Sequence, residues 1–332
     1  MTSTPRPAFH DPVSPPPAGS PWTVLRLLRW STQYLAEKGI DEGRLDVEHL
    51  LAHALDTTRL ELYLEFERPV TSDELQRFKP LLLERAGRKP LQYILGRAHF
   101  RELVLEVDPR VLIPRPETEE LVEAVLARVR EWGREGLSAV DVGTGSGAIA
   151  LSLAREGPFG RVVGIDRSAA ALEVAWANRE RLDESMREVV EFREGDLLDA
   201  LESGEEFDVV VSNPPYVAAG EYEELAPEVR EWEPMEALMA SGDGLHVLRR
   251  LIREAPEFLR AEGLLALEVG AGQAHEVADA IRSQPGLGAP VTLRDLSGRD
   301  RIVMAHRTEG RDTPAGSTRR TNSQMRSEGT DE

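Results

Sequence analysis

The 332-residue chain contains no cysteine. Without thiols it has no disulfide framework and no thiolate metal site. It also lacks an uninterrupted apolar run of the roughly 20 residues that a membrane-spanning helix requires. Its N-terminus shows no charged-then-apolar pattern of a signal peptide. We therefore expect a cytoplasmic protein without a membrane partner.

Basic residues are scarce relative to acidic ones. The chain has 40 Lys and Arg against 59 Asp and Glu, which gives a formal net charge of −19. Nonspecific binding to nucleic acid depends on clustered Lys and Arg, so this balance argues against it, although a local basic patch stays open. An acidic surface would suit a basic protein partner or a salt-adapted cytoplasm, and charge alone leaves both interpretations open.

The N-terminal part of the chain changes character at two places. Residues 1–20 are rich in proline and are predicted to form a disordered extension. Residues 21–88 carry apolar side chains at helix spacing, with a capping-box pattern from Thr71 to Glu74. They predict a small helical bundle. Residues 89–115 are expected to form a linker with a short β-hairpin, pairing strands 99–107 and 110–113.

Residues 116–307 alternate strand and helix patterns. Such alternation predicts an α/β domain built on a mainly parallel sheet. Residues 308–332 are polar and rich in Thr, Ser and Arg, and are expected to be a disordered tail. The two helical histidines His49 and His53 have no evident third ligand, so no metal site is expected.

The segment Asn213-Pro214-Pro215-Tyr216 follows residues 207–212, an apolar, β-branched run typical of a buried parallel strand. Two consecutive prolines remove two backbone donors, so the strand must end there. The turn combines free carbonyl groups with a carboxamide and an aromatic ring. It is suited to accept hydrogen bonds from an NH2 group and to stack on the plane that carries it. Taken alone, a plain strand-ending turn remains the alternative.

A glycine-rich turn, Gly143-Thr144-Gly145-Ser146-Gly147, lies upstream between a strand pattern and a helix pattern. Glycine lets the backbone approach a bound ligand, and the following helix offers its N-terminal amides. No Gly-Lys-Ser/Thr sequence is present, which excludes a triphosphate-binding loop. By itself the turn is equally compatible with a dinucleotide-binding fold or an ordinary tight turn.

Acidic residues follow the next two strand patterns. Asp166 ends residues 161–166, where a carboxylate is able to accept both hydroxyls of a ribose. A helix N-cap is the alternative role for Asp166. Asp196 follows a third strand pattern and precedes Leu197, an arrangement suited to an adenine edge. These acids favour a nucleoside-bearing ligand beside the glycine turn.

In this order, the glycine turn, the acids and Asn-Pro-Pro-Tyr resemble the class I S-adenosylmethionine-dependent methyltransferases that modify a planar nitrogen. Residues 90–96 (PLQYILG) and 112–119 (LIPRPETE) are similar to signature segments of the release-factor glutamine N5-methyltransferase family. The resemblance extends from about Trp22 to about Arg307. It implies a Rossmann-like catalytic domain and an N-terminal bundle that contacts the release factor. Relatives often carry an aromatic residue where this chain has Leu197, so the adenine contact there is expected to be backbone and apolar.

The resemblance also implies roles for the site residues. Asn213 and Pro214 are expected to accept hydrogen bonds from the glutamine amide of a Gly-Gly-Gln loop, and Tyr216 to pack on the amide plane. These three are the predicted catalytic residues, and with Pro215 they form the predicted substrate site. The predicted residues for the cofactor, S-adenosyl-L-methionine, are Gly143, Thr144, Gly145, Ser146, Gly147, Asp166, Asp196, Leu197 and Asn213.

Peptide-chain release factors are the expected partners, and the enzyme is expected to act as a monomer. Three alternatives remain at this point. A base-amine methyltransferase of DNA or RNA shares the planar NH2 acceptor, although the acidic balance disfavours it. A sister family that methylates a ribosomal protein shares Asn-Pro-Pro-Tyr but usually differs at residues 115–119. A nucleotide-binding module without catalysis would have no need for Asn-Pro-Pro-Tyr.

Overall fold

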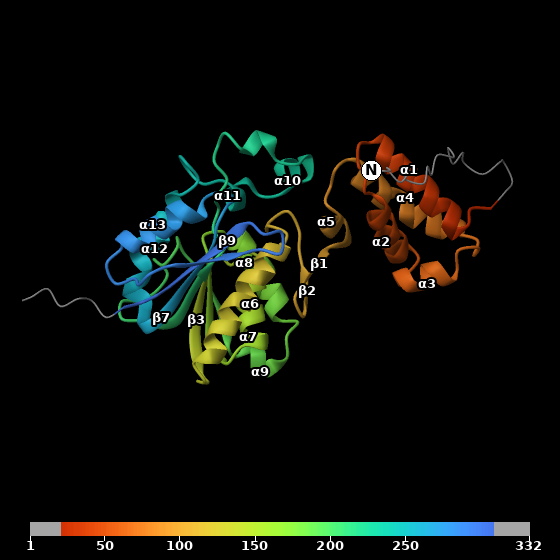
Figure 1. The fold of residues 1–332 in the computed structure, drawn as a ribbon. Helices are drawn as coiled ribbons and strands as arrows, with labels where there is room; N and C mark the ends of the chain where they lie inside the picture. Colours follow the sequence, from red (N-terminus) through yellow and green to blue (C-terminus); the bar gives the residue numbers. More distant parts are fainter. Residues whose placement is uncertain (1–20, 309–332) are drawn as a thin grey trace, which may run out of the picture.

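The computed structural model describes residues 21–308, and Figure 1 shows them as a helical bundle beside a larger α/β domain. The predicted N-terminal extension and residues 309–332 of the predicted tail lie outside this range. Within the described range, no helix combines the length and the apolar character needed to cross a membrane.

Helices in the N-terminal part pack around one apolar core. They are α1 (Val24–Glu37), α2 (Arg44–Ala54), α3 (Arg59–Leu64) and α4 (Ser72–Ala86). Apolar side chains at helix spacing, such as Leu50 and Phe78, are almost fully buried in this core. The predicted capping box is confirmed, since Glu74 donates its amide to the Thr71 hydroxyl at 3.3 Å and accepts from the Thr71 amide at 2.8 Å. It starts α4 where the sequence indicated.

The connector between the two parts contains a helix and a hairpin: α5 (Leu91–Leu95), β1 (Arg97–Phe100) and β2 (Leu103–Glu106). The predicted pairing of residues 99–107 with residues 110–113 is wrong, because both strands lie before residue 107. Pro109 has no amide hydrogen, and the Asp108 carboxylate accepts from the Arg110 amide at 3.0 Å. This stretch therefore forms a turn in place of a second strand.

The α/β domain is built on a seven-stranded sheet with the order β5-β4-β3-β6-β7-β9-β8 within the described residues. Its strands are β3 (Leu137–Val142), β4 (Phe159–Asp166), β5 (Val190–Glu194), β6 (Phe207–Ser212), β7 (Leu259–Glu268), β8 (Val291–Arg294) and β9 (Asp300–His306). The run from β5 to β7 is parallel, whereas β9 lies antiparallel to β7 and β8. The predicted mainly parallel α/β sheet is confirmed.

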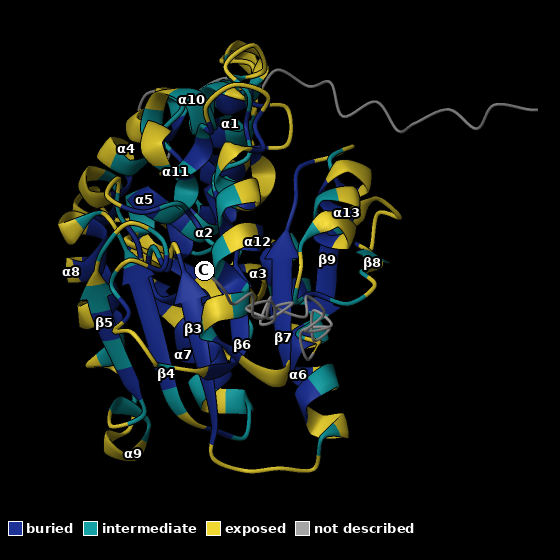
Figure 2. Cartoon of the chain, turned by 90° about the vertical axis from the view of Figure 1, so that its left-hand side faces the viewer, coloured by how far each residue is buried: buried dark blue, intermediate teal, exposed yellow. Residues whose placement is uncertain are grey.

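Helices cover both faces of this sheet, which is buried along its central strands (Figure 2). One face packs on α6 (Pro116–Glu131), α7 (Ala148–Glu156) and α8 (Ala169–Arg179); α12 (His246–Phe258) and α13 (Ala274–Ser283) cover the other. The short helix α9 (Glu184–Arg187) precedes β5. Alternate residues of β6 point to opposite faces, so Val209 and Val210 join different cores. All six residues of β6 are buried, as expected for a central parallel strand.

The strand order changes direction between β3 and β6. From β3 the chain continues to β4 and β5 on one side, and from β6 it continues to β7 on the other. Ligands of open α/β sheets bind in the crevice at the carboxyl ends of the strands beside such a switch. Gly143 follows β3 and Asn213 follows β6, so both predicted motifs lie at this crevice.

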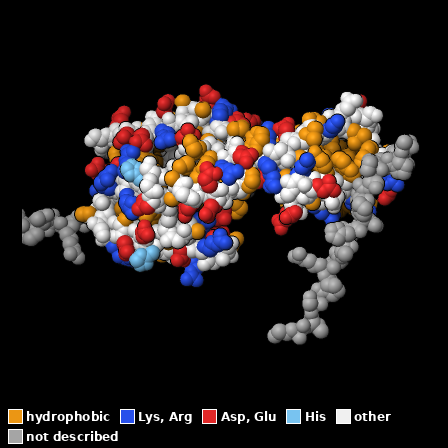
Figure 3. All heavy atoms as spheres, turned by 90° about the horizontal axis from the view of Figure 1, so that it is seen from above, with side chains coloured by type: hydrophobic (Ala, Val, Ile, Leu, Met, Phe, Trp, Pro, Cys, Tyr) orange, Lys and Arg blue, Asp and Glu red, His pale blue; other side chains and the backbone are white. Residues whose placement is uncertain are grey.

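The surface carries charges of both signs. From above, the molecule shows two lobes, and acidic and basic side chains are interspersed over them (Figure 3). Many acids are paired with arginines, as Glu205 is with Arg193 at 2.8 Å and with Arg161 at 2.5 Å. Among the described residues seen in this view, the basic side chains form no continuous stripe of the kind that holds a nucleic-acid backbone.

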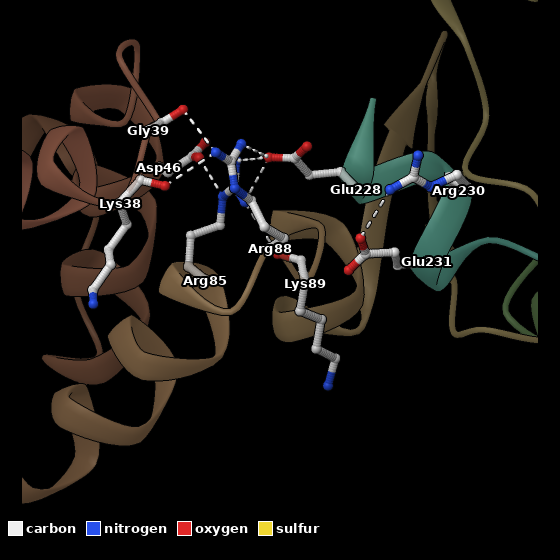
Figure 4. Close-up of polar contacts among 9 residues, drawn as sticks. All are labelled: Lys38, Gly39, Asp46, Arg85, Arg88, Lys89, Glu228, Arg230 and Glu231. Atoms are coloured by element: carbon white, nitrogen blue, oxygen red, sulfur yellow. Dashed lines mark hydrogen bonds and ion pairs between the residues drawn. The ribbon is translucent and has the colours of Figure 1, made fainter. Parts of the chain in front are cut away.

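Residues 217–240, here called the covering segment, link the Asn-Pro-Pro-Tyr turn to the part of the chain that leads into α12. They include η1 (Tyr222–Glu224), α10 (Pro227–Trp232) and α11 (Met235–Leu238). Glu228 joins this segment to the bundle, accepting from Arg85 at 3.2 Å and from Arg88 at 3.1 Å (Figure 4). The buried Arg85 also donates to Asp46 at 2.6 Å. Charge-assisted hydrogen bonds therefore connect the bundle to the cover of the α/β domain.

Candidate active site

A cavity of about 660 Å³ opens at the carboxyl ends of the strands. The glycine turn, the ends of β4 and β6, and the covering segment contribute to its wall. Predicted site residues on this wall are Gly143, Gly145, Asp166, Asp196, Leu197, Asn213 and Pro215. Glu236, Ala237, Met239 and Ala240 line it from the covering segment.

The glycine turn divides into residues that face the cavity and residues that support it. A Cβ atom at Gly145 would meet no atom within 4 Å, and φ is +54° there, so this residue leaves the backbone open to a ligand. At Gly147 (φ +84°) a Cβ would meet Leu151 and Phe192 at 3.1–3.2 Å, so glycine permits close helix–sheet packing.

Thr144 and Ser146 are buried and do not line the cavity within residues 21–308. The Thr144 hydroxyl donates to Asp141 at 2.6 Å, and the Ser146 carbonyl accepts from Asn178 at 2.9 Å. Together with Gly147, they therefore hold the turn in shape, whereas Gly143 and Gly145 provide its exposed edge.

Asp166 ends β4 on the cavity wall. One carboxylate oxygen accepts from the amide of Gly145 and the other from the amide of Ser168, each at 2.9 Å. Each oxygen of an ionised carboxylate has about two acceptor positions. Both oxygens therefore retain acceptor capacity for a hydroxyl-bearing ligand, while the backbone fixes their direction.

Asp196 and Leu197 form the third part of this wall, after β5. The exposed Asp196 carboxylate accepts from Arg250 of α12 at 2.5 Å. Leu197 is half-buried and has a φ of +57°, a conformation that is uncommon for residues with a side chain. Leu197 thus lines the cavity in a left-handed backbone conformation and brings an apolar side chain to this wall.

Asn213 reaches the cavity from the end of β6. Its Nδ2 donates to the Thr118 hydroxyl at 2.9 Å, and that hydroxyl donates to the Glu268 carboxylate at 2.7 Å. Thr118 comes from the first turn of α6 and Glu268 from the end of β7. Three segments distant in the chain therefore meet behind the carboxamide.

Pro214 and Tyr216 belong to the same turn but do not line the cavity formed by the described residues. Pro214 is buried, and the Tyr216 ring packs against the core that includes α12 and α13. Burial raises the pKa of Tyr216 to about 12, so its hydroxyl stays protonated at neutral pH. The Tyr216 carbonyl accepts from Gln273 at 3.0 Å, which fixes the far end of the turn.

Sequence reasoning assigned no role to Asp141, Thr118, Glu268 or Arg250. Asp141 is fully buried, and burial raises its pKa to about 7. In the sequence, Asp141 is an acid inside an apolar strand pattern, and Glu268 is an acid that directly follows the apolar residues 264–267. Acids at such positions could have indicated that these two residues have a role in the site. Thr118 stood in the segment quoted for the family resemblance. Arg250 had no comparable signal.

Comparison with known proteins first defines the class. A family model described as "Methyltransferase domain" matches residues 134–292. The solved catalytic domain of hMettl16, in complex with a MAT2A 3'UTR hairpin, is 17% identical and has a TM-score of 0.51, covering 70% of this chain and 83% of that chain. At this identity the likeness shows the fold alone. The fold is that of a class I S-adenosylmethionine-dependent methyltransferase, which confirms the predicted fold class.

The family follows from the whole length of the chain. A model described as "PrmC N-terminal domain" matches residues 26–96. The release factor glutamine methyltransferase of Geobacter sulfurreducens is 42% identical over 282 residues, covering 85% of this chain and 96% of that relative. That of Chlorobaculum tepidum is 43% identical over 268 residues, covering 79% and 90%. The chain therefore belongs to the release factor glutamine methyltransferase family, as the motifs predicted.

S-adenosyl-L-methionine is the cofactor of this class, and the residues of the cavity fit it. The open backbone edge at Gly145 leaves space for a ligand. Asp166 offers carboxylate acceptors to ribose hydroxyls, while Ile165 and Leu197 add apolar wall beside them. The acidic groups also suit a ligand that carries positive charge.

Proposed function

We propose that this chain transfers a methyl group from S-adenosyl-L-methionine to the side-chain amide nitrogen, N5, of the glutamine in the Gly-Gly-Gln loop of peptide-chain release factors. Relatives bear the name release factor glutamine methyltransferase. The observation that carries the proposal is the carboxamide of Asn213, which stands on the same cavity wall as Asp166. One cavity thus joins an acceptor for a substrate amide to a site suited to the methyl donor.

The proposed chemistry depends on orientation. An amide nitrogen is a poor nucleophile because its lone pair is delocalised into the carbonyl group. The bound cofactor supplies a methyl group on a positively charged sulfur, which needs no further activation. The Asn213 Oδ1 and the Pro214 carbonyl accept hydrogen bonds from the glutamine NH2 and hold the nitrogen in a reactive direction. The nitrogen loses a proton after it is methylated, so no dedicated general base is required.

The remaining site residues receive their proposed roles from the same arrangement. Gly143, Gly145, Asp166, Asp196 and Leu197 hold the cofactor, supported by the buried residues of the glycine turn. Pro215 shapes the substrate site, and Tyr216 packs beside the substrate amide. The Tyr216 ring lies against the α12–α13 core, and a ring held there stiffens the turn that carries Asn213.

The division of labour between the domains is also a proposal. Residues 21–88 bind the release factor, residues 89–115 link the two parts, and residues 116–307 perform catalysis. The contact of Glu228 with Arg85 and Arg88 supports a fixed placement of the bundle relative to the cavity. We propose that the enzyme acts as a monomer in the cytoplasm, where release factors work. Sedimentation of the purified chain, alone and with a release factor, tests its oligomeric state.

The test of the function is methyl transfer from labelled S-adenosylmethionine to separate acceptors. Purified release factors, ribosomal protein, duplex DNA and RNA are incubated with the enzyme, and the modified residue is mapped by mass spectrometry. We expect label only on the release factor, at the glutamine of the Gly-Gly-Gln loop. Label on nucleic acid, with activity falling steeply as salt rises, would instead support the base-amine alternative. Label on the ribosomal protein would support the sister family.

A further inference from the structure

We propose that Thr118 and Glu268 are positioning residues that determine which end of the Asn213 carboxamide faces the substrate. This inference rests on the proposed function, because it concerns the group that would receive the glutamine amide. It assigns to the first turn of α6 and to the end of β7 a part in orienting the reaction.

The three side chains form a continuous chain of hydrogen bonds. Asn213 donates from Nδ2 to the Thr118 Oγ1 at 2.9 Å, and Thr118 donates to the Glu268 Oε2 at 2.7 Å. Thr118 is 5% exposed and Glu268 is 1% exposed, so water has little access to compete for these bonds. In such surroundings a hydrogen bond is stronger than in water, and an unmade one is costly.

The chemistry of the three groups allows this chain of hydrogen bonds to run in only one direction while Glu268 is ionised. An ionised carboxylate only accepts, so Glu268 takes the single hydroxyl hydrogen of Thr118. The threonine oxygen then has only lone pairs left for its other neighbour. Asn213 must present its NH2 group to Thr118, which leaves Oδ1 on the opposite side. That atom is the acceptor required for a substrate NH2 group.

Hydrogen bonds in the reverse direction would leave Asn213 unable to accept from the substrate amide. A protonated Glu268 is able to donate to Thr118, which frees the threonine hydrogen for the Oδ1 of Asn213. The carboxamide would then turn by a half-rotation and face the substrate with its own NH2 group. Two donors would oppose each other, and the glutamine amide would lose an acceptor. A buried group left without its partner is costly.

The surroundings of Glu268 place this reversal near neutral pH. Burial raises the pKa of Glu268 to about 7; the threonine hydrogen bond and the charges of Arg301 and Arg115 oppose that shift, and Glu117 adds to it. Tyr216 also faces the carboxylate and stays neutral. The ionised form that sets the useful direction is lost as pH falls through about 7. The methyl-transfer rate should therefore fall on the acidic side.

A spectroscopic test needs neither cofactor nor substrate. The sequence has asparagine only at positions 178, 213 and 322, so asparagine-selective 15N labelling yields few side-chain NH2 signals. We expect the Asn213 signal, identified by its loss in Asn213→Ala, to change with pH across neutrality. Asn178 donates to the carbonyls of Glu106 and Ser146 and serves as an internal control.

Thr118→Val should abolish the pH response of the Asn213 signal, because valine has a similar shape but no hydroxyl. An Asn213 signal that is insensitive to pH in the wild type, or equally sensitive in Thr118→Val, would overturn the proposal.

The kinetic test compares side chains that differ in the hydroxyl group. We expect Thr118→Val to lower the single-turnover rate by about 10- to 100-fold, while KM for the release factor and cofactor affinity change little. Thr118→Ser keeps the hydroxyl and should restore most of the rate. Thr292→Val, at an exposed position of β8, is the matched control. A normal rate in Thr118→Val, or an equal loss in Thr118→Ser, would show that the hydroxyl does not position Asn213.

Glu268→Gln tests the direction of the hydrogen bonds from Asn213 through Thr118 to residue 268. The variant cannot ionise, so the acidic fall in rate seen in the wild type should disappear. The same acidic midpoint in Glu268→Gln would contradict the assignment. If the wild type methylates no release factor, the proposed function fails, yet the NMR comparison still decides whether Thr118 and Glu268 orient the carboxamide. The two failures are therefore distinguishable.

Discussion

The two halves of the cavity are fixed in different ways. In the donor half, after β3 and β4, backbone amides of Gly145 and Ser168 hold the Asp166 carboxylate. In the acceptor half, after β6, side chains hold Asn213: Thr118 lies 95 residues away, and Glu268 a further 150 from Thr118. A half held by backbone is set once its strands pair. A half held by side chains depends on helix packing, on single hydroxyl and carboxyl groups, and on pH.

The largest effect is expected from Asn213→Ala, in the acceptor half. Removing an acceptor aimed at the substrate amide should lower the methyl-transfer rate by about 100- to 1000-fold, the scale measured for comparable preorganised groups. Cofactor affinity should fall much less, because Asp166 and the glycine turn remain. Single-turnover kinetics and calorimetry separate the two quantities. Equal losses in rate and affinity would erase the proposed distinction between the halves.

Asp166→Ala should act in the opposite manner. Loss of the carboxylate should weaken cofactor binding by about 1.5–3 kcal/mol, the usual range for hydrogen bonds to a charged group. Binding of the release factor should be unaffected. Calorimetry measures the effect, with the exposed acid Asp183 changed to alanine as the control. Unchanged affinity in a folded Asp166→Ala variant would remove Asp166 from the donor half.

A smaller effect is expected where the bundle meets the covering segment. Glu228→Gln removes the charge that Arg85 and Arg88 share. We expect kcat/KM for the release factor to fall by about fivefold, or about 1 kcal/mol, with cofactor affinity unchanged.

Glu231→Gln, on the same helix but paired with Arg230, is the control for the Glu228 variant (Figure 4). A loss of cofactor affinity in Glu228→Gln would show that the bundle acts on the donor half instead.

The smallest effect is expected from Arg250→Gln. Arg250 pairs with Asp196, whose side chain is 54% exposed. Exposed ion pairs contribute less than about 1 kcal/mol and weaken with salt. Cofactor affinity measured at low and high salt should therefore change little. A large loss would mean that the donor half also depends on a distant side chain, and the contrast between the halves would weaken.

The sequence predicted the local features of the site and missed the long-range ones. Gly145, Asp166 and Asn213 reach one cavity because each follows or ends a parallel strand, and such ends share one edge of the sheet. Nothing local indicates that Thr118 contacts Asn213, because that pairing arises only when α6 packs across the sheet.

The strand that the sequence predicted at residues 110–113 does not form, and the reason is local. Val111, Leu112 and Ile113 follow each other as in a strand, yet the turn at Asp108 and Pro109 precedes them. Ile113 then donates its amide to the Glu233 carboxylate at 3.1 Å rather than to a neighbouring strand. Turn chemistry and a side-chain acceptor override β-propensity here.

The contact at Glu228 connects the bundle to the covering segment, which lines the cavity. Under the proposed function, this contact sets the distance that an acceptor protein has to bridge between the bundle and the cavity. An acceptor protein long enough to touch the bundle while its loop enters the cavity presents its glutamine at a high effective concentration. A short peptide with the same loop reaches only one end and gains no such advantage. The size and shape of the acceptor, as well as its sequence, thereby become criteria of recognition.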